Sequence, residues 1–243
     1  MTIDLKGRTV LITGAARRIG RLLALSVAEA GGNLILHHGH SPQEAQILMD
    51  DVTRLGVEAH ILQADLEDGH QAAELLPRAG EFAPVFGLVN SAAIFEPRTL
   101  ANTDLATWDR HLAINLTAPF LLSQAFARQV TPEGEGRIIN ILDWRALRPT
   151  ADHLPYTISK AALAALTQSL ATALAPRITV NGLALGAILP PSDKKSTDDI
   201  LSQVPAGRWA RADELTQAFL FLLTGPAYIT GEIIHVDGGR HLI

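Results

Sequence analysis

The sequence predicts a single α/β domain, residues 1–243, with a doubly wound, seven-stranded parallel sheet and helices on both of its faces. Short β-branched, apolar runs alternate with longer amphipathic stretches along the chain, as in repeated βαβ units. Most of these runs are apolar throughout, which is typical of strands buried on both faces. With 243 residues, 47% of them hydrophobic, the chain can bury the core of one such domain.

Glycines and a helix cap mark the first two βα units. The strand TVLIT, residues 9–13, ends at Gly14, and the amphipathic helix 19–30 follows the glycine turn. The strand NLILHH, residues 33–38, leads to SPQEA, in which Ser41 is placed to cap a helix that runs to about residue 55. The glutamate of SPQEA is spaced to reach back to this cap, as in a capping box.

The rest of the chain repeats this alternation. Further strands are expected at residues 57–65, 84–90, 137–143, 177–185 and 232–239. Helical spacing predicts helices at residues 71–79, 105–130 with an interruption at Pro119, from Tyr156 onward and 213–223. The weakly patterned segment 186–208 is either a surface loop or a flap, and its place after a strand end favours a flap over the ligand pocket.

Charge and composition exclude several kinds of partner. The formal charge of −5 and the absence of a Lys or Arg run argue against nucleic acid or an anionic membrane. The absence of cysteine excludes disulfides and zinc–thiolate sites and fits a reducing compartment. No apolar run reaches the roughly 20 residues that span a bilayer, and the N-terminal residues lack a signal-peptide pattern. We therefore expect a cytoplasmic protein with a small-molecule partner.

The segment 137–160 contains the strongest catalytic candidates. Its strand RIINILD brings Asp143 to an edge of the sheet, and Tyr156 and Lys160 share one face of the next helix. A lysine ammonium near a phenol stabilises the phenolate, so Tyr156 can serve as a general acid. A lone YxxxK pair can also be a surface tyrosine and a solvated lysine, and Asp143 can merely cap a loop.

The turn TGAARRIG predicts a dinucleotide site. It joins a strand to a helix, where backbone N–H groups and the helix N-terminus hold a pyrophosphate, although the usual GxGxxG spacing is absent. Arg18 stands where glycine is expected, and its guanidinium can bind anionic or carbonyl oxygens or face solvent. Asp65 is placed to bind an adenine edge. The expected cofactor contacts outside the second strand and the catalytic segment are Gly14, Arg17, Arg18, Ile19, Asp65, Leu66, Asn90, Ser91 and Ala92.

The end of the second strand indicates NADPH rather than NADH. Chains that bind NAD usually place an acid there for the ribose 2′-hydroxyl, whereas residues 37–41 read HHGHS. Arg17, His40 and Ser41 form a suitable cradle for a 2′-phosphate. A metal site on the three histidines would need a geometry that a strand end does not guarantee, so no metal is expected.

Several motifs together resemble the short-chain dehydrogenase/reductase family over nearly the whole chain. They are TGAARRIG, Asp65, VNSAA, Asn115 in INLTAPF, YTISK and the closing VDGG. The resemblance implies a Rossmann-type, usually tetrameric enzyme in which Tyr156 is the catalytic acid. It also implies that Lys160 holds the nicotinamide ribose and lowers the Tyr156 pKa, and that Asn115 helps to hold a proton-relay water.

Two departures from the family pattern resemble the pteridine reductases and the bacterial dihydromonapterin reductases. Asp143 replaces the usual serine and Arg18 the usual glycine, and LHHGHSPQEA, Phe95 after VNSAA and the closing DGGRHLI add to the likeness. In that group the pterin lies between the nicotinamide and an aromatic ring, here Phe95, and the arginine reaches both cofactor phosphate and pterin. Phe95 can also be an ordinary core or rim aromatic.

We therefore expect an NADPH-dependent reductase of dihydropterin rings of the biopterin or monapterin type, or of dihydrofolate, with Asp143, Tyr156, Lys160 and Asn115 as catalytic residues. Reducing a C=N bond requires hydride at carbon and a proton at nitrogen. A carboxylate that shares a hydrogen bond with Tyr156 can feed this proton through the tyrosine or through water. Two alternatives stay open: a carbonyl or alcohol oxidoreductase of the same fold, and a nucleotide-sensing protein without catalysis. The expected substrate contacts are Arg18, Phe95, Asp143 and Tyr156, while pocket and subunit-contact roles both remain open for Trp144, Arg145 and Arg148.

Overall fold

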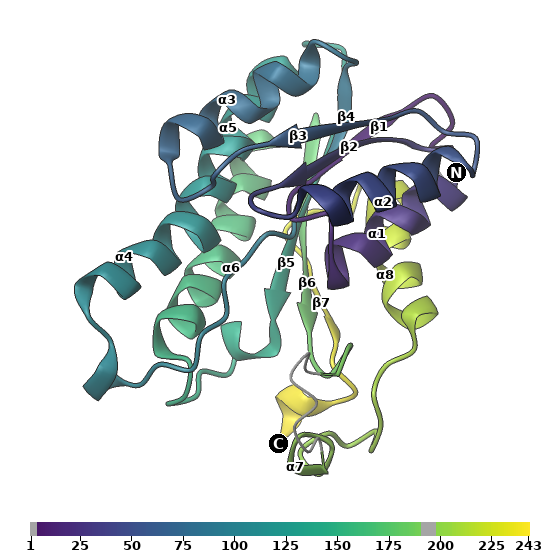
Figure 1. Cartoon of the computed structure of the whole chain (residues 1–243). Helices are drawn as coiled ribbons and strands as arrows, with labels where there is room; N and C mark the ends of the chain where they lie inside the picture. Colours follow the sequence, from purple (N-terminus) through teal and green to yellow (C-terminus); the bar gives the residue numbers. More distant parts are fainter. Residues whose placement is uncertain (1–3, 191–197) are drawn as a thin grey trace.

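A computed structural model describes residues 4–190 and 198–243 and confirms the predicted fold class. Seven parallel strands form one sheet in the order β3-β2-β1-β4-β5-β6-β7 (Figure 1). The strand order reverses between β1 and β4, because the chain builds outward from β1 in one direction and then from β4 in the other. In open α/β sheets of this kind, ligands bind at the carboxyl ends of the strands, beside this reversal.

Each strand and helix that the sequence predicts is present, with ends shifted by a few residues. The strands are β1 (Thr9–Ile12), β2 (Asn33–His38), β3 (Ala59–Gln63), β4 (Val85–Asn90), β5 (Gly136–Asp143), β6 (Ile178–Leu185) and β7 (Ile233–Val236). The helices are α1 (Arg18–Glu29), α2 (Pro42–Thr53), α3 (Gly69–Gly80), α4 (Leu105–Leu112), α5 (Ala118–Gln129), α6 (Leu154–Leu174), α7 (Asp198–Leu201) and α8 (Ala212–Thr224). Short helical turns not expected from sequence are η1 (Leu100–Asn102), η2 (Ala113–Thr117), η3 (Trp144–Ala146) and η4 (Arg240–Leu242).

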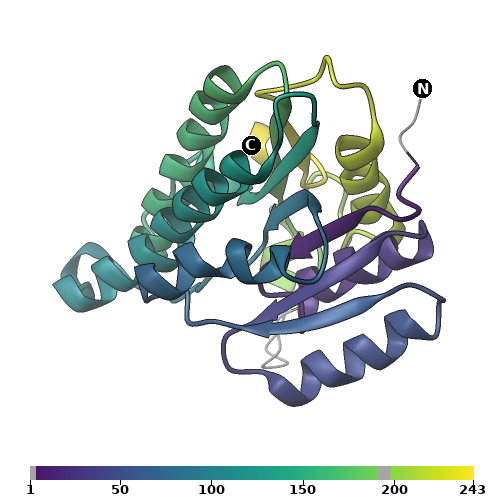
Figure 2. The same cartoon turned by 90° about the horizontal axis from the view of Figure 1, so that it is seen from above.

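Helices cover both faces of the sheet (Figures 1 and 2). On one face, α1, α2 and α8 pack over a core that includes Val10 and Phe219. On the other, α3, α5 and α6 enclose a core that includes Leu11 and Phe126. Val10 and Leu11 are neighbours in β1 and are both fully buried, because successive strand residues point to opposite faces. This explains why three of the four β1 residues are apolar and why Thr9 is buried with them.

Two local expectations are corrected. The helical segment 105–130 is interrupted by the π-helical turn η2 rather than at Pro119, which lies in the first turn of α5. Ser41 occupies the N-cap position of α2, but its side chain makes no capping hydrogen bond with the described residues. Glu44 does not complete a capping box and instead lies 3.9 Å from the guanidinium of Arg17. The Glu44 carboxylate therefore lies near the exposed Arg17 guanidinium rather than at the N-terminal N–H groups of α2.

The segment expected to form a flap, residues 186–208, is described only in part, because residues 191–197 lie outside the described residues. Its first residues continue from β6, and the Gly186 N–H donates to the Val236 carbonyl at 3.0 Å. None of the helices in the described ranges has the length and apolar character needed to cross a membrane.

Candidate active site

β5 and α6 bring Asp143 and Tyr156 into direct contact. Asp143 is the last residue of β5, and the Tyr156 phenol donates a hydrogen bond to its Oδ2 at 3.1 Å. The other carboxylate oxygen, Oδ1, accepts the backbone N–H of Arg145 at 2.9 Å and so caps the turn η3. Asp143 therefore caps a loop and contacts the tyrosine at the same time, with one oxygen for each task.

The Tyr156 phenol is held in its protonated form. Burial raises the pKa of Tyr156 well above its usual value, and the negative charge of Asp143 raises this pKa further. The expected lowering by Lys160 is not found, because the Lys160 ammonium donates to the Ile141 carbonyl at 2.6 Å and lies 5.9 Å from the tyrosine ring centre. Burial lowers the pKa of Lys160 itself to about 8. Because the raised pKa keeps the phenol protonated at pH 7, Tyr156 has a proton to donate, although it is a weaker acid than free tyrosine.

Phe95 lies beside this pair, in the middle of the segment 91–99 between β4 and η1. Its ring is 52% exposed, so it is not an ordinary core aromatic. The ring meets Tyr156 edge-on, with centroids 4.6 Å apart, and stacks on His153 with centroids 4.0 Å apart and an interplanar angle of 8°. One face of Phe95 is thus covered by His153, which the sequence analysis did not single out. A flat ligand can stack on the accessible part of this ring or replace His153 on it.

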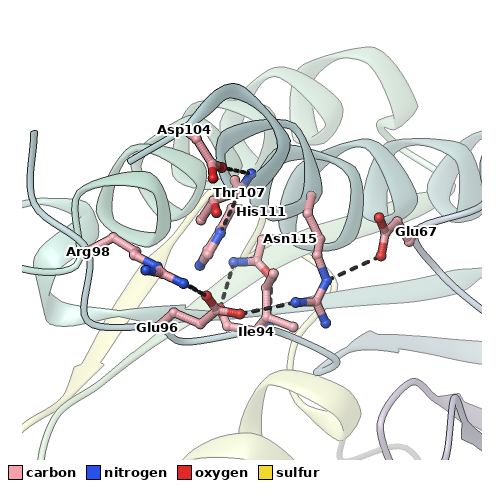
Figure 3. Close-up of polar contacts among 9 residues, drawn as sticks. Glu67, Ile94, Glu96, Arg98, Asp104, Thr107, His111 and Asn115 are labelled. Atoms are coloured by element: carbon pink, nitrogen blue, oxygen red, sulfur yellow. Dashed lines mark hydrogen bonds and ion pairs between the residues drawn. The ribbon is translucent and has the colours of Figure 1, made fainter. Parts of the chain in front are cut away.

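Asn115 fixes the backbone that carries Phe95 (Figure 3). Its Oδ1 accepts the Ile94 N–H at 3.0 Å, and its Nδ2 donates to the Ile94 carbonyl at 3.1 Å. On the other side of Phe95, the Glu96 carboxylate accepts hydrogen bonds from two arginines, Arg98 at 3.4 Å and Arg110 at 3.1 Å. These contacts hold the segment on both sides of the ring. The expected role of Asn115 toward a relay water stays a prediction.

The glycine turn is shaped by close backbone contacts. Gly14 has a positive φ of 63°, and a Cβ there would lie 2.9 Å from the Ala92 Cα. A Cβ on Gly20 would lie 2.2 Å from the Gly14 carbonyl oxygen. Only glycine fits at either position, because the turn, α1 and the end of β4 approach so closely.

His37 accepts the backbone N–H of Gly14, one of the turn residues that were expected to contact the cofactor. This N–H donates to His37 Nδ1 at 3.1 Å, so His37 Nε2 carries the proton and donates to the Ala64 carbonyl at 3.0 Å. Burial lowers the pKa of His37 to about 4, so the ring is neutral at pH 7. His37 therefore ties the glycine turn to β2 and to the residue after β3. Sequence reasoning placed it only in the polar cluster at the strand end.

The N-terminus of α1 remains suited to an anion. Arg17 is the N-cap residue, its side chain makes no capping hydrogen bond, and the first turn of α1, which lies wholly in the described range, contains no acid. Exposed N–H groups at a helix N-terminus attract negative charge. Ile19, in this turn, is partly buried against the core.

Arg18 links the glycine turn to the segment after β6. Its φ of 50° is left-handed, the conformation that glycine adopts easily, which accounts for the glycine usual at this position in the family. Its guanidinium donates to the Pro190 carbonyl at 3.0 Å and contacts the Leu189 carbonyl at 3.4 Å. The side chain thus reaches from the glycine turn to the segment after β6, rather than only into solvent.

The three residues expected to hold a 2′-phosphate lie at the ends of β2 and the glycine turn. The side chains of Arg17 and His40 are 65% and 82% exposed, whereas Ser41 is buried. Arg17 lies 3.9 Å from Glu44, and His40 Nε2 lies 4.0 Å from Asp65 Oδ2. The exposed Arg17–Glu44 ion pair contributes only about 0–1 kcal/mol, so a phosphate can replace Glu44 beside Arg17.

The remaining expected cofactor contacts lie after β3 and β4. The Asp65 N–H donates to the Gln71 side chain at 2.9 Å, and the Asp65 carboxylate accepts the Glu67 N–H at 3.0 Å. Leu66 is buried and contributes no side chain to the surface. Asn90 is also buried, and it donates to the Asn140 side chain at 2.8 Å.

Thr13 joins the two strands at the point where the strand order reverses. Its hydroxyl accepts the backbone N–H groups of Ser91 and Ala92 at 3.0 and 3.1 Å and donates to the Val89 carbonyl at 3.3 Å. The side chain fixes the end of β4 against the glycine turn. Sequence reasoning assigned it only to the strand, although a hydroxyl directly before the glycine turn was the available signal.

Of the residues that follow Asp143, Arg145 contacts the site, whereas Trp144 and Arg148 contact residues near the C-terminus. Arg145 turns back toward Asp143, with its Nη1 3.5 Å from Oδ1. The Trp144 ring lies 4.5 Å from the guanidinium carbon of Arg240, and Arg148 contacts the His241 carbonyl at 3.5 Å. Within the described ranges, no group of three or more His, Asp or Glu side chains is arranged to hold a metal ion.

Comparison with known proteins identifies similar sequences and structures. The family model for enoyl-(acyl carrier protein) reductase matches residues 14–241. The 3-oxoacyl-(acyl-carrier-protein) reductase FabG of Aquifex aeolicus (strain VF5) is 34% identical over 249 residues, covering 98% of this chain and 99% of the relative. FolM alternative dihydrofolate reductase 1 from Brucella canis, solved with NADP, is 33% identical with a TM-score of 0.90, covering 99% of this chain and 96% of that one. A blue fluorescent protein from a metagenomic library, solved with NADPH, is 31% identical with a TM-score of 0.90, covering 98% and 99%.

Proposed function

The chain belongs to the short-chain dehydrogenase/reductase family, and from that premise we propose that it is an NADPH-dependent reductase that converts dihydropterin rings to the tetrahydro form. The observation that carries the proposal is the hydrogen bond from Tyr156 to Asp143 at 3.1 Å, beside the half-exposed ring of Phe95. A serine at position 143, as in most of the family, would bring no charge to this contact. The structural similarity to FolM alternative dihydrofolate reductase 1 supports the same substrate class.

The polar groups suit the protonation that a C=N bond requires. When bound, the nicotinamide cofactor supplies the hydride. Tyr156 presents a protonated phenol, since burial and Asp143 both raise its pKa. Asp143 can relay a replacement proton from solvent to Tyr156 after transfer, because its Oδ2 already faces the phenol oxygen. Phe95 and Arg18 are the groups that we assign to the flat ring of the substrate.

The residues at the cofactor end fit NADPH. The N-terminus of α1 presents N–H groups to a pyrophosphate, and Gly14 and Gly20 leave no room for a side chain in the turn. The exposed side chains of Arg17 and His40 lie beside the end of β2, where the sequence HHGHS supplies no carboxylate for a ribose 2′-hydroxyl. The structures solved with NADP and NADPH support the same assignment.

A turnover assay tests the proposal directly. The purified protein is incubated with NADPH and, in separate reactions, dihydrobiopterin, dihydrofolate and a panel of ketones that includes a 3-oxoacyl thioester. We expect NADPH oxidation with a dihydropterin, accompanied by formation of the tetrahydro product. Turnover of ketones alone would exclude the pterin assignment.

A second function, reduction of a ketone, is favoured by the sequence similarity to 3-oxoacyl-(acyl-carrier-protein) reductases. In that case Asp143 takes the place of the usual serine, and Tyr156 protonates a carbonyl oxygen instead of a ring nitrogen. The ketone panel of the same assay measures this activity, so a single experiment separates the two functions.

Cofactor selectivity depends on Arg17. We expect Arg17→Ala to weaken NADPH binding about 10-fold to 100-fold, because a charge-assisted hydrogen bond to the 2′-phosphate is lost, and to leave NADH binding nearly unchanged. Fluorescence titration with each cofactor measures both affinities. Arg54→Ala, which removes an arginine of similar exposure at the far end of α2, is the matched control. Equal losses for NADPH and NADH would refute the assignment.

A further inference from the structure

Arg145 contacts the carboxylate of Asp143, which accepts the hydrogen bond from Tyr156. Its backbone N–H and its Nη1 lie 2.9 and 3.5 Å from the same oxygen, Oδ1 of Asp143. The other oxygen, Oδ2, is thereby left to the Tyr156 phenol at 3.1 Å. The side chains of Asp143 and Arg145 are only 16% and 12% exposed, so water competes little for this contact. The carboxylate cannot turn away from Tyr156 without leaving Arg145.

The guanidinium of Arg145 is itself held from two more sides. Its Nη2 donates to Asp152 Oδ2 at 3.2 Å, and its central carbon lies 4.7 Å from the Trp144 ring centre. Trp144 is buried. A planar, delocalised cation suits this combination of a carboxylate on each side and an aromatic face, and a lysine would match it only in charge.

The same guanidinium is linked to the ring assigned to the substrate. It lies 5.7 Å from the Phe95 centroid. Its partner Asp152 also contacts His153 Nδ1 at 2.9 Å, and the His153 ring stacks on Phe95. Arg145 therefore contacts the proton-transfer pair on one side and the supports of the stacking ring on the other.

The charges around Tyr156 determine the direction in which Arg145 shifts the pKa of Tyr156. Of the charged groups that surround the phenol, Asp143 on β5 raises the pKa of Tyr156 and Arg145 on η3 lowers it. Lys160 on α6 is directed to the Ile141 carbonyl, and the His153 ring stacks on Phe95. Removing Asp143 and removing Arg145 should therefore shift the phenol ionisation in opposite directions.

We propose that Arg145 is a positioning residue that keeps the Asp143 carboxylate facing Tyr156 and couples this pair to the Phe95 ring. For catalysis the inference rests on the proposed function, since it assumes that Asp143 and Tyr156 deliver the proton. Its electrostatic part concerns the protein alone and does not depend on which substrate is reduced.

Kinetics test the positioning role. We expect Arg145→Met to lower kcat about 10-fold to 100-fold while KM for NADPH stays within about twofold, and Arg145→Lys to recover part of the loss. Arg148→Met, which removes an exposed arginine of the same loop, should match the wild type. Asp152→Asn removes an anchor of Arg145 but keeps its contact with Asp143, so its loss should be smaller. A loss from Asp152→Asn equal to that from Arg145→Met would indicate a merely structural role and overturn the proposal.

A spectroscopic arm needs no substrate. The chain has two tyrosines, so 3-fluorotyrosine in a Tyr228→Phe background leaves Tyr156 as the only fluorinated site, and fluorination makes its phenol more acidic. We expect ¹⁹F NMR to show ionisation at a higher pH in Arg145→Met, by about one pH unit, and at a lower pH in Asp143→Asn. An unchanged or lower midpoint in Arg145→Met would overturn the proposal.

The two arms separate this inference from the proposed function. The kinetic comparison uses whichever substrate the wild type reduces, a dihydropterin or a ketone. Absence of dihydropterin turnover together with the expected ¹⁹F shifts would reject the proposed function and retain the electrostatic role of Arg145. Dihydropterin turnover without any effect of Arg145→Met would retain the proposed function and reject the role of Arg145.

Discussion

Tyr156→Phe should lower turnover about 100-fold to 10,000-fold, the range that a positioned general acid contributes. The phenol is the group that faces Asp143, and the substitution removes its proton while keeping the ring against Phe95. NADPH affinity should change little, because the glycine turn and the α1 N-terminus are untouched. Stopped-flow measurement of NADPH oxidation gives the rate, and fluorescence titration gives the affinity.

Tyr228→Phe is the matched control, since Tyr228 is fully exposed and far along the chain from the site. Its turnover should equal that of the wild type. A Tyr156→Phe variant with wild-type turnover would show that Tyr156 is not the general acid. NADPH binding by the wild type without turnover of any tested substrate would favour the remaining alternative, a protein that binds the nucleotide without catalysis.

Acid should destabilise the protein through His37. The folded-state pKa of His37 is about 4, below the ordinary 6.5, because burial disfavours the charged ring. A depressed pKa means that the unfolded chain binds the proton first. The stability tied to the neutral ring is therefore complete above pH 6.5 and is lost as the pH falls toward 4. The difference corresponds to about 3 kcal/mol of unfolding free energy.

Urea unfolding at pH 7 and pH 4 measures this loss, and His37→Asn isolates the contribution of the histidine. The variant has no ring to protonate, so its unfolding free energy should fall by about 3 kcal/mol less than that of the wild type over this range. His70→Asn, at an exposed histidine, should follow the wild type. Parallel pH dependence in wild type and His37→Asn would show that another group controls acid unfolding.

The fold was predictable because its pattern is repetitive. β1 is buried at each position and apolar at three of its four positions, as is typical of a central parallel strand. The interruption of the segment 105–130 was misplaced because proline usually breaks a helix, whereas Pro119 lies in a first helical turn, where proline is tolerated.

The candidate site was predictable where residues act in sequence-local patterns. Asp143 and Tyr156 follow from a strand end and the next helix, and they do meet. The partners that bind across the fold were not predictable. His37 reaches Gly14 from another strand, and the role of Arg145 depends on how η3 turns back, which neither spacing nor composition specifies.

The π-helical turn η2 has a consequence for any redesign of the substrate loop. One extra residue in a turn rotates all later side chains by about 100° around the helix axis. α4 and α5 are thus out of phase, and Asn115 sits at the phase change, where it binds the backbone beside Phe95. Deleting one residue here would bring the two helices into phase and turn Asn115 away from that backbone. Grafts between related enzymes therefore have to preserve the helical phase across this junction as well as the loop sequence.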